Sequence, residues 1–378
     1  MTTLRSAAGQ WQLNRYPVRS HDPLQAWDAA DELLHDIIAQ RDDQQPLLVN
    51  DQFGALLLPL AGLPVASHAD SYISHCAWHA NLASNQLPNT LQPLSPLDKA
   101  PAATDVVYLK IPKSQSLLEF QLAKLTAELA PGTQLFAAAK SKLFTPAVRA
   151  LFEQYCTDVD VSLIQRKCRT LSAKLTSAPI QAEQFVSTWQ VPEFNLSLQH
   201  HAGVFARNQL DIGARFLLNN MPPSGAERVI DLGCGNGVLG LRYAQLSPAS
   251  QITWVDESFL AIASTRANIE QNLTGTPGST HGSTTAQYHA QVDDCLAQQD
   301  DHSCDLILCN PPFHQEHAVT EHIARQMFRD SKRVLRKNGE LWVVANRHLP
   351  YYQPLKRLFK QVHQVAQNSK FVILKARG

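Results

Sequence analysis

The hydrophobic pattern of the first half of the chain alternates short apolar runs with segments of helical periodicity. Residues 23–34, the stretch up to Leu82 and residues 120–129 carry apolar side chains at helical spacing, which predicts helices. The apolar runs, typical of buried strands, lie at residues 46–51, 65–70, 105–112 and 132–139. Strands that alternate with helices favour an α/β fold with a mostly parallel sheet flanked by helices.

The second half repeats this alternation. Residues 185–189 and 194–198 alternate apolar and polar side chains, the pattern of a hairpin that opens a second domain. Residues 210–215 then lead into a helix. Four further runs predict strands at residues 229–232, 252–256, 288–292 and 305–309.

Matching segments recur between the halves at nearly constant offsets. Residues 105–112 match 305–312 at an offset of 200, residues 132–139 match 339–346 at 207, and Lys167 stands against Lys370 at 203. These offsets favour a duplication, although any two parallel-sheet domains share part of the pattern. We expect two tandem Rossmann-like domains, at residues 1–178 and 179–378.

The run at 229–232 ends abruptly in a glycine-rich turn made of Gly233, Cys234, Gly235, Asn236 and Gly237. Glycines remove side chains from one side of such a strand-to-helix turn, so a ligand can lie against the backbone. Asp231 disfavours a phosphate here and suits a cationic or zwitterionic ligand. Asp256 ends the next strand, where its carboxylate can accept both hydroxyls of a ribose. We interpret Cys234 as a small side chain required by the turn.

Other positions are expected beside the same ligand. Phe205, Asp211 and Gly213 precede the glycine turn and are predicted to pass near the cofactor. Asp294 follows the strand at 288–292 and is predicted to meet an adenine amine, with Asp293 as a competitor for that role.

The strand at 305–309 runs into Asn310, Pro311, Pro312 and Phe313. Ligands of open α/β sheets bind beyond the carboxyl ends of the strands, so this turn should face the same crevice as the glycines. The Asn310 side-chain carbonyl and the Pro311 backbone carbonyl can accept the two N–H bonds of an amine conjugated to a planar base. Phe313 would stack on that base. The motif predicts methylation of a planar nitrogen.

The first domain lacks these features. Its turn after residue 50 has the single glycine Gly54, and Lys110 and Lys113 flank the position of the Asn-Pro-Pro motif. We therefore expect neither cofactor binding nor catalysis in this domain. Basic residues of this domain could instead contact phosphates, with plain surface charges as the alternative for several of them: Lys110, Lys113, Lys140, Lys142, Arg166, Lys167 and Arg169.

Composition adds the expected class of partner. Net charge is zero, but residues 325–378 carry 13 Lys and Arg against 2 acids, a net of +11 that favours a polyanion. The seven cysteines form no C-x-x-C pair, so we expect reduced thiols and no metal. His314, His317 and His322 are interpreted as surface or RNA-contacting residues. No long apolar run or signal sequence is evident, which predicts a cytoplasmic protein.

These motifs resemble the tandem-domain guanine N2 methyltransferases of bacterial ribosomal RNA, the RsmC and RlmG family. The resemblance spans nearly the whole chain. It implies S-adenosylmethionine as methyl donor and one guanine of 23S rRNA as acceptor, because the likeness is closer to the large-subunit branch. The residues that carry it are 203–205, 210–213, 231–237, 310–313 and 345–348, with 23–32, 70–74 and 346–349 for the large-subunit branch. The chain departs from the pattern at residues 274–286 and at Ala214.

Alternative functions stay open at this point. One alternative is a 16S rRNA guanine N2 methyltransferase of the RsmC type, and a protein glutamine methyltransferase shares the Asn-Pro-Pro element. A non-catalytic assembly factor for rRNA would instead have a broken cofactor motif. The sequence leaves the oligomeric state open and favours a monomer.

Overall fold

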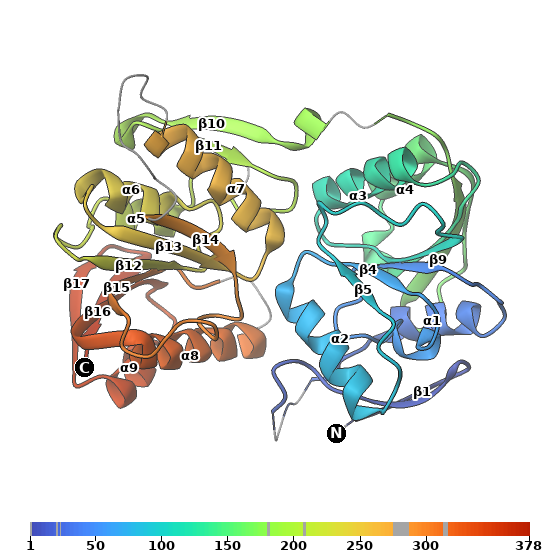
Figure 1. The fold of residues 1–378 in the computed structure, drawn as a ribbon, viewed down its shortest axis with the longest axis horizontal. Coiled ribbons are helices and arrows are strands. Elements are labelled where there is room, and N and C mark those ends of the chain that lie inside the picture. Colours follow the sequence, from blue (N-terminus) through green and yellow to red (C-terminus); the bar gives the residue numbers. More distant parts are fainter. Residues whose placement is uncertain are drawn as a thin grey trace. The chain divides into compact units, whose positions relative to one another are not determined.

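The structure is a computed structural model that describes residues 2–19, 22, 24–179, 182–206, 209–274, 287–312 and 317–378, without the side chains of 182–183, 274 and 317–321. The chain forms two compact units, Met1–Phe185 and Val186–Gly378. Each unit contains one seven-stranded sheet with helices on both faces (Figure 1). The predicted α/β fold with two mostly parallel sheets is confirmed.

The first unit arranges its sheet in the order β5-β4-β3-β6-β7-β9-β8, with a separate β1–β2 hairpin. Neighbours from β5 to β7 are parallel, and β9 and β8 are antiparallel. The elements are β1 Thr2–Ser6, β2 Gly9–Leu13, α1 Ala29–Ile38, β3 Pro46–Val49, β4 Ala66–His68, α2 Tyr72–Ser84, β5 Gln92–Leu94, β6 Val106–Lys110, α3 Gln115–Glu128, β7 Gln134–Lys140, α4 Pro146–Tyr155, β8 Cys156–Val161 and β9 Cys168–Leu175.

The second unit has the sheet order β14-β13-β12-β15-β16-β18-β17 and opens with the antiparallel β10–β11 hairpin predicted from the sequence. Its elements are β10 Ser187–Val191, β11 Leu196–His200, α5 Ile212–Leu218, β12 Arg228–Leu232, α6 Val238–Leu246, β13 Gln251–Asp256, α7 Phe259–Ile269, β14 Tyr288–Val292, β15 Cys304–Cys309, α8 His317–Val334, β16 Leu335–Asn346, α9 Tyr352–Leu358, β17 Gln361–Gln367 and β18 Phe371–Arg377. Helices α5, α6 and α7 cover one face of this sheet, and α8 and α9 cover the other (Figure 1).

The two sheets have the same topology, strand for strand. Val49 pairs with His68 as Leu232 pairs with Val255, so Asn50 occupies the position of Gly233. Both residues are left-handed, with φ of 64° for Asn50 and 69° for Gly233. Strands β6 and β7 are the counterparts of β15 and β16, the equivalence that the sequence offsets predicted.

Two helices begin elsewhere than the apolar pattern predicted. Helix α1 begins at Ala29 rather than at residue 23 because Asp28 caps it: the Asp28 carboxylate accepts from Ala30 N at 3.0 Å. Helix α3 begins at Gln115 rather than at residue 120, with Ser114 accepting from Leu117 N at 3.3 Å. In both helices a capping side chain, which satisfies a free backbone N–H, determines the first residue.

Candidate active site

The glycine turn connects β12 to α6. Gly233 N and Cys234 N both donate to Val255 O, at 2.8 and 3.0 Å, which ties the turn to β13. Gly233, Gly235 and Gly237 have φ of 69°, 56° and 80°, a conformation that residues with a Cβ seldom adopt. A Cβ on Gly235 would meet no atom within 4 Å, so the turn is open on that side.

Asp231 lies beneath the turn and is fully buried. One carboxylate oxygen accepts from Gly240 N at 2.8 Å, and the other has no hydrogen-bond partner among the residues that the structure describes. Burial raises the pKa of Asp231 to about 8, with nearby Asp256 adding to the shift. A cationic group bound near this carboxyl would favour its ionised form.

Asp256 ends β13 and holds the turn from the opposite side. Its carboxylate accepts from Gly235 N at 2.9 Å through one oxygen and from Ser258 N at 3.0 Å through the other. Burial raises its pKa above the ordinary value. Each carboxylate oxygen can accept more than one hydrogen bond, so ribose hydroxyls could still be bound.

Buried side chains under the turn explain several of its residues. Trp254 Nε1 donates to Gly237 O at 2.9 Å, and a Cβ on Gly240 would lie 2.3 Å from that nitrogen. Asn236 Nδ2 donates to His200 Nε2 at 2.7 Å, and its carbonyl oxygen accepts from Val238 N. Asn236 thus joins the turn to β11. The sequence analysis did not predict that His200 would bind Asn236 or that Gly240 would lie against Trp254.

Cys234 is buried in the turn, 3.5 Å from the Thr265 hydroxyl, which itself donates to Gly235 O. Burial raises the pKa of the Cys234 thiol well above its ordinary value. A thiol that stays protonated is a poor nucleophile. The geometry supports a structural role for this side chain.

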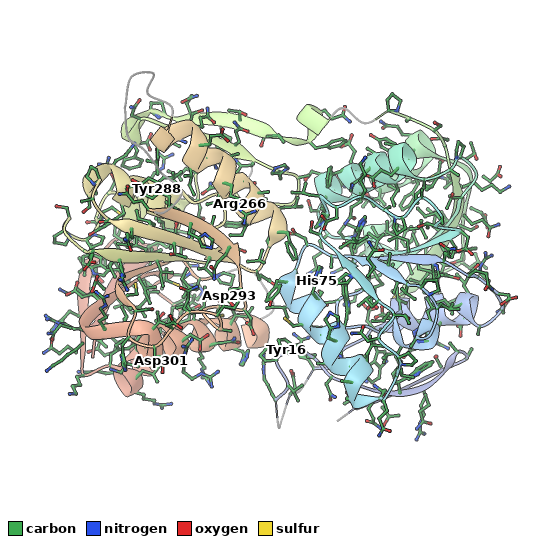
Figure 2. The ribbon with its side chains drawn as sticks, in the orientation of Figure 1. Tyr16, His75, Arg266, Tyr288, Asp293 and Asp301 are labelled. Carbon is green, nitrogen blue, oxygen red and sulfur yellow. The ribbon has the colours of Figure 1, made fainter. Side chains whose placement is uncertain are left out.

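Two acids, Asp293 and Asp294, follow β14, and Figure 2 labels the first of them. Asp293 is buried, one of its oxygens accepts from Gln298 N at 3.0 Å, and the other has no partner in the described part of the chain. Burial raises the pKa of Asp293 to about 6. Asp294 accepts from Gln326 Nε2 of α8 at 2.8 Å. Both candidates for the adenine amine therefore retain an acceptor.

Asn310 follows β15 and is oriented by Asp211. Its Nδ2 donates to Asp211 Oδ2 at 3.2 Å, and the same oxygen accepts from Ala214 N at 2.8 Å and so caps α5. The Asn310 Oδ1 is buried and has no partner among the described residues. A Cβ on Gly213 would lie 3.0 Å from the Asp211 carboxylate and 3.1 Å from Phe371 Cε1, so a side chain there would require both neighbours to shift slightly. Pro311 and Pro312 continue the turn, and Phe313 lies outside the described residues.

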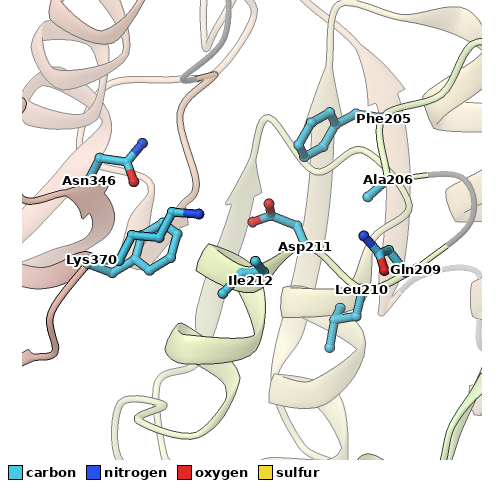
Figure 3. Close-up of a pocket in the computed structure, with 9 residues that line it drawn as sticks. Phe205, Ala206, Gln209, Leu210, Asp211, Ile212, Asn346 and Lys370 are labelled. Carbon is cyan, nitrogen blue, oxygen red and sulfur yellow. The ribbon is translucent and has the colours of Figure 1, made fainter.

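A cavity of about 220 Å³ adjoins Asp211. Figure 3 shows Asn346 and Lys370 on one side and Phe205 and Ala206 across from them, with the Asp211 carboxylate between. Phe205 is 57% exposed, so much of its ring is accessible at the cavity. The lining residues are Phe205, Ala206, Gln209, Leu210, Asp211, Ile212, Asn346, Lys370 and Phe371. The sequence analysis predicted Phe205 and Asp211 as site residues. No local pattern indicated that Gln209 and Phe371 would line the same cavity.

The corresponding edge of the first unit is closed by its own side chains. Lys110, at the position of Asn310, forms ion pairs with Asp28 at 2.9 Å and Asp31 at 2.6 Å. Asp51 is buried and accepts from the backbone N–H groups of Gly54, Leu56 and Leu57. The Lys110 ammonium is therefore used in ion pairs within the unit. The prediction that Lys110 contacts a phosphate was wrong.

Two further findings concern other kinds of site. Within the described ranges, no three His, Cys, Asp or Glu side chains are grouped so as to hold a metal ion. His314 falls outside those ranges, and the side chain of His317 is likewise not described. No helix in the described part of the chain is long and apolar enough to span a bilayer.

Three features together define a Rossmann-like methyltransferase domain. They are the glycine turn after β12, the acid at the end of β13 and the Asn-Pro-Pro motif after β15. Residues 195–375 match the Methyltransferase small domain family, and residues 1–177 match the RLMG N-terminal domain family. The chain is 45% identical to ribosomal RNA large subunit methyltransferase G of Aeromonas hydrophila over 99% of both chains. It is 41% identical to the Shewanella putrefaciens protein of that name over 100% of both chains. The chain belongs to the ribosomal RNA large subunit methyltransferase G family.

A solved structure shares the whole fold. The 16S rRNA N2 methyltransferase RsmC from T. thermophilus, solved in complex with AdoMet and guanosine, superposes with a TM-score of 0.78 at 20% identity. The match covers 100% of this chain and 97% of that one. At this identity the likeness concerns the fold, and it includes both units.

Proposed function

We propose that this chain transfers a methyl group from S-adenosylmethionine to the exocyclic N2 amine of one guanine in 23S ribosomal RNA, and so works in the cytoplasm. The observation that carries the proposal is the Asn310 amide, held by Asp211 with its carbonyl oxygen buried and unpartnered among the described residues. Membership of the large subunit family supports 23S rather than 16S rRNA as substrate.

The glycine turn fits the cofactor. Gly235 leaves open space where a side chain would stand, and Asp231 has one oxygen without a partner among the described residues. Asp256 is held by two backbone N–H groups and keeps further lone pairs. We assign the cationic methionine end of the cofactor to the Asp231 side and the ribose hydroxyls to Asp256. For the adenine amine, both acids keep acceptor capacity: Asp293 has a buried oxygen without a partner among the described residues, and Asp294 accepts a single hydrogen bond within the same ranges, from Gln326.

S-adenosylmethionine supplies a methyl group on a positively charged sulfur. The residues of this chain must present the amine, whose lone pair is delocalised into the base. The Asn310 Oδ1 and the Pro311 carbonyl accept its two N–H bonds and aim the nitrogen at the methyl carbon. The N2 lone pair forms the new N–C bond as the C–S bond breaks, and the sulfur keeps that electron pair. N2 then releases one proton to water through the same carbonyl acceptors.

The cavity beside Asp211 suits the extruded base. Phe205, which is 57% exposed, offers an aromatic face for stacking, and Asn346 offers an amide that can hydrogen-bond a base edge. Lys370 adds a cation for a neighbouring phosphate. The first unit, whose equivalent edge is filled by Lys110 and its acids, is assigned to RNA recognition rather than chemistry.

The test is methylation of separate 16S and 23S transcripts with radiolabelled cofactor, followed by digestion to nucleosides. Label in N2-methylguanosine from 23S rRNA is expected, and Asn310→Ala should abolish it while cofactor affinity stays within about twofold. Label in a methylated adenosine, or in 16S rRNA alone, would contradict the proposal.

A further inference from the structure

The turn between β8 and β9 in the first unit contains strained basic residues. Gln165 and Cys168 exchange both backbone hydrogen bonds, at 2.9 and 2.7 Å, so Arg166 and Lys167 form a two-residue hairpin turn. Both have positive φ, 49° and 62°. A tight hairpin of this type favours Asn-Gly, since residues with large side chains resist the left-handed conformation. Arg-Lys is therefore an unfavourable choice for the fold alone.

The same edge of the sheet gathers further cations. Lys113 follows β6, Lys140 ends β7 and Lys142 follows it, and Ser141 N donates to Lys167 O at 2.9 Å. All are exposed. Of the five residues Lys113, Lys140, Lys142, Arg166 and Lys167, called here the basic edge, only Arg166 has an ion pair among the described residues, with Glu32 at 2.8 Å. The basic edge thus holds unneutralised positive charge.

The equivalence between the two units indicates which ligand the basic edge binds. Lys167 immediately precedes β9 just as Lys370 precedes β18, and Lys370 lines the cavity assigned to the RNA base in the second unit. Beside the turn, Leu163 is 84% exposed and Ile164 56% exposed, which adds apolar surface next to the charges. Cations at a protruding tip with aliphatic neighbours suit a phosphate backbone and the sugars along it.

We propose that the β8–β9 turn and the rest of the basic edge form a phosphate-binding surface that holds the substrate RNA away from the reaction centre. The inference rests on the proposed function, because it assumes an RNA substrate. Strain at Arg166 and Lys167 is retained because the two charges are needed at the tip, where the preferred turn residues would remove them.

The test compares the full chain with two double variants of equal charge loss. Arg166→Asn with Lys167→Gly installs the preferred turn. The control, Lys99→Gln with Arg149→Gln, removes two exposed cations of the same unit that lie outside the basic edge. Binding of protein-free 23S transcript is measured by filter retention over a series of KCl concentrations, and thermal unfolding is followed for each protein.

The turn variant should unfold at the same temperature as the native chain or higher, yet bind RNA about tenfold more weakly at 0.1 M KCl. Its plot of log affinity against log salt should flatten by about 1.5, the loss of two phosphate contacts. Cofactor affinity and turnover at saturating RNA should not change, and the control should bind within about twofold of the native chain.

Equal RNA binding by the turn variant and the control would overturn the surface proposal, as would a weaker affinity with an unchanged salt slope. Either result leaves the proposed function intact if the native chain still methylates 23S rRNA. Failure of the native chain to methylate any rRNA would instead remove the proposed function, and the two failures are distinguishable.

Discussion

The two units place different side chains in one structural position. In the second unit Asn310 donates to the capping acid of α5, Asp211, and keeps a buried carbonyl oxygen without a partner among the described residues. In the first unit Lys110 forms ion pairs with the capping acid of α1, Asp28, and also with Asp31, so the ammonium charge is fully compensated within the unit. The frame is shared, and at this position only the second unit keeps a side-chain acceptor without a partner among the described residues.

The largest effect is expected when the second unit is made like the first. In Asn310→Lys, the new ammonium would pair with Asp211 and occupy the place of the amine substrate. We expect methyl transfer to fall by at least about 10⁴-fold, since the nucleophile is no longer positioned. Cofactor affinity, measured by calorimetry, should stay within about twofold. Measurable methyl transfer by this variant would show that Asn310 is not the residue that accepts a hydrogen bond from the substrate amine.

The reverse change in the first unit should affect stability rather than activity. Lys110→Met leaves Asp28 and the buried Asp31 without their cation, which should lower the free energy of unfolding by about 3–5 kcal/mol. The double variant Lys110→Met with Asp31→Leu should recover most of this loss. Denaturant unfolding measures both, and methylation at low temperature should persist. Full stability in the single variant would indicate that the ion pairs contribute little.

A smaller effect is expected from the acid that orients Asn310. Asp211→Ser keeps a capping oxygen for α5 but is too short to reach the Asn310 amide, so turnover should fall about 30-fold with an unchanged melting temperature. Asp211→Asn retains an oxygen that can accept from both partners and should restore most of the activity. Equal losses in the two variants, or a rise in cofactor dissociation constant instead of a lower turnover, would argue against a positioning role.

These contacts show where sequence reasoning succeeded and where it did not. Residues 288–292 and the β10–β11 hairpin were predicted because an apolar pattern of fixed period is a local property. The starts of α1 and α3 were misplaced because single capping side chains, Asp28 and Ser114, set them. The link from Asn310 to Asp211 joins residues 99 positions apart, so no local pattern could reveal it. The position of Asp211 in the sequence predicted that it lies near the cofactor, but not that it binds the Asn310 amide.

The smallest predicted effect concerns the pH dependence of cofactor binding. It involves Asp231 of the second unit, and the first unit is not expected to bind the cofactor. Burial raises the pKa of Asp231 to about 8, so near pH 6 this carboxyl is largely protonated. A bound cation favours the ionised form, and binding must then release a proton. Affinity for S-adenosylmethionine should therefore rise by up to about tenfold from pH 6.5 to 7.5, until the ligand's own amine begins to deprotonate. Calorimetry in two buffers of different ionisation enthalpy should detect the released proton. Asp231→Asn should bind more weakly, with no such rise and no released proton; a pH profile unchanged by that substitution would show that Asp231 does not meet the cationic end of the cofactor.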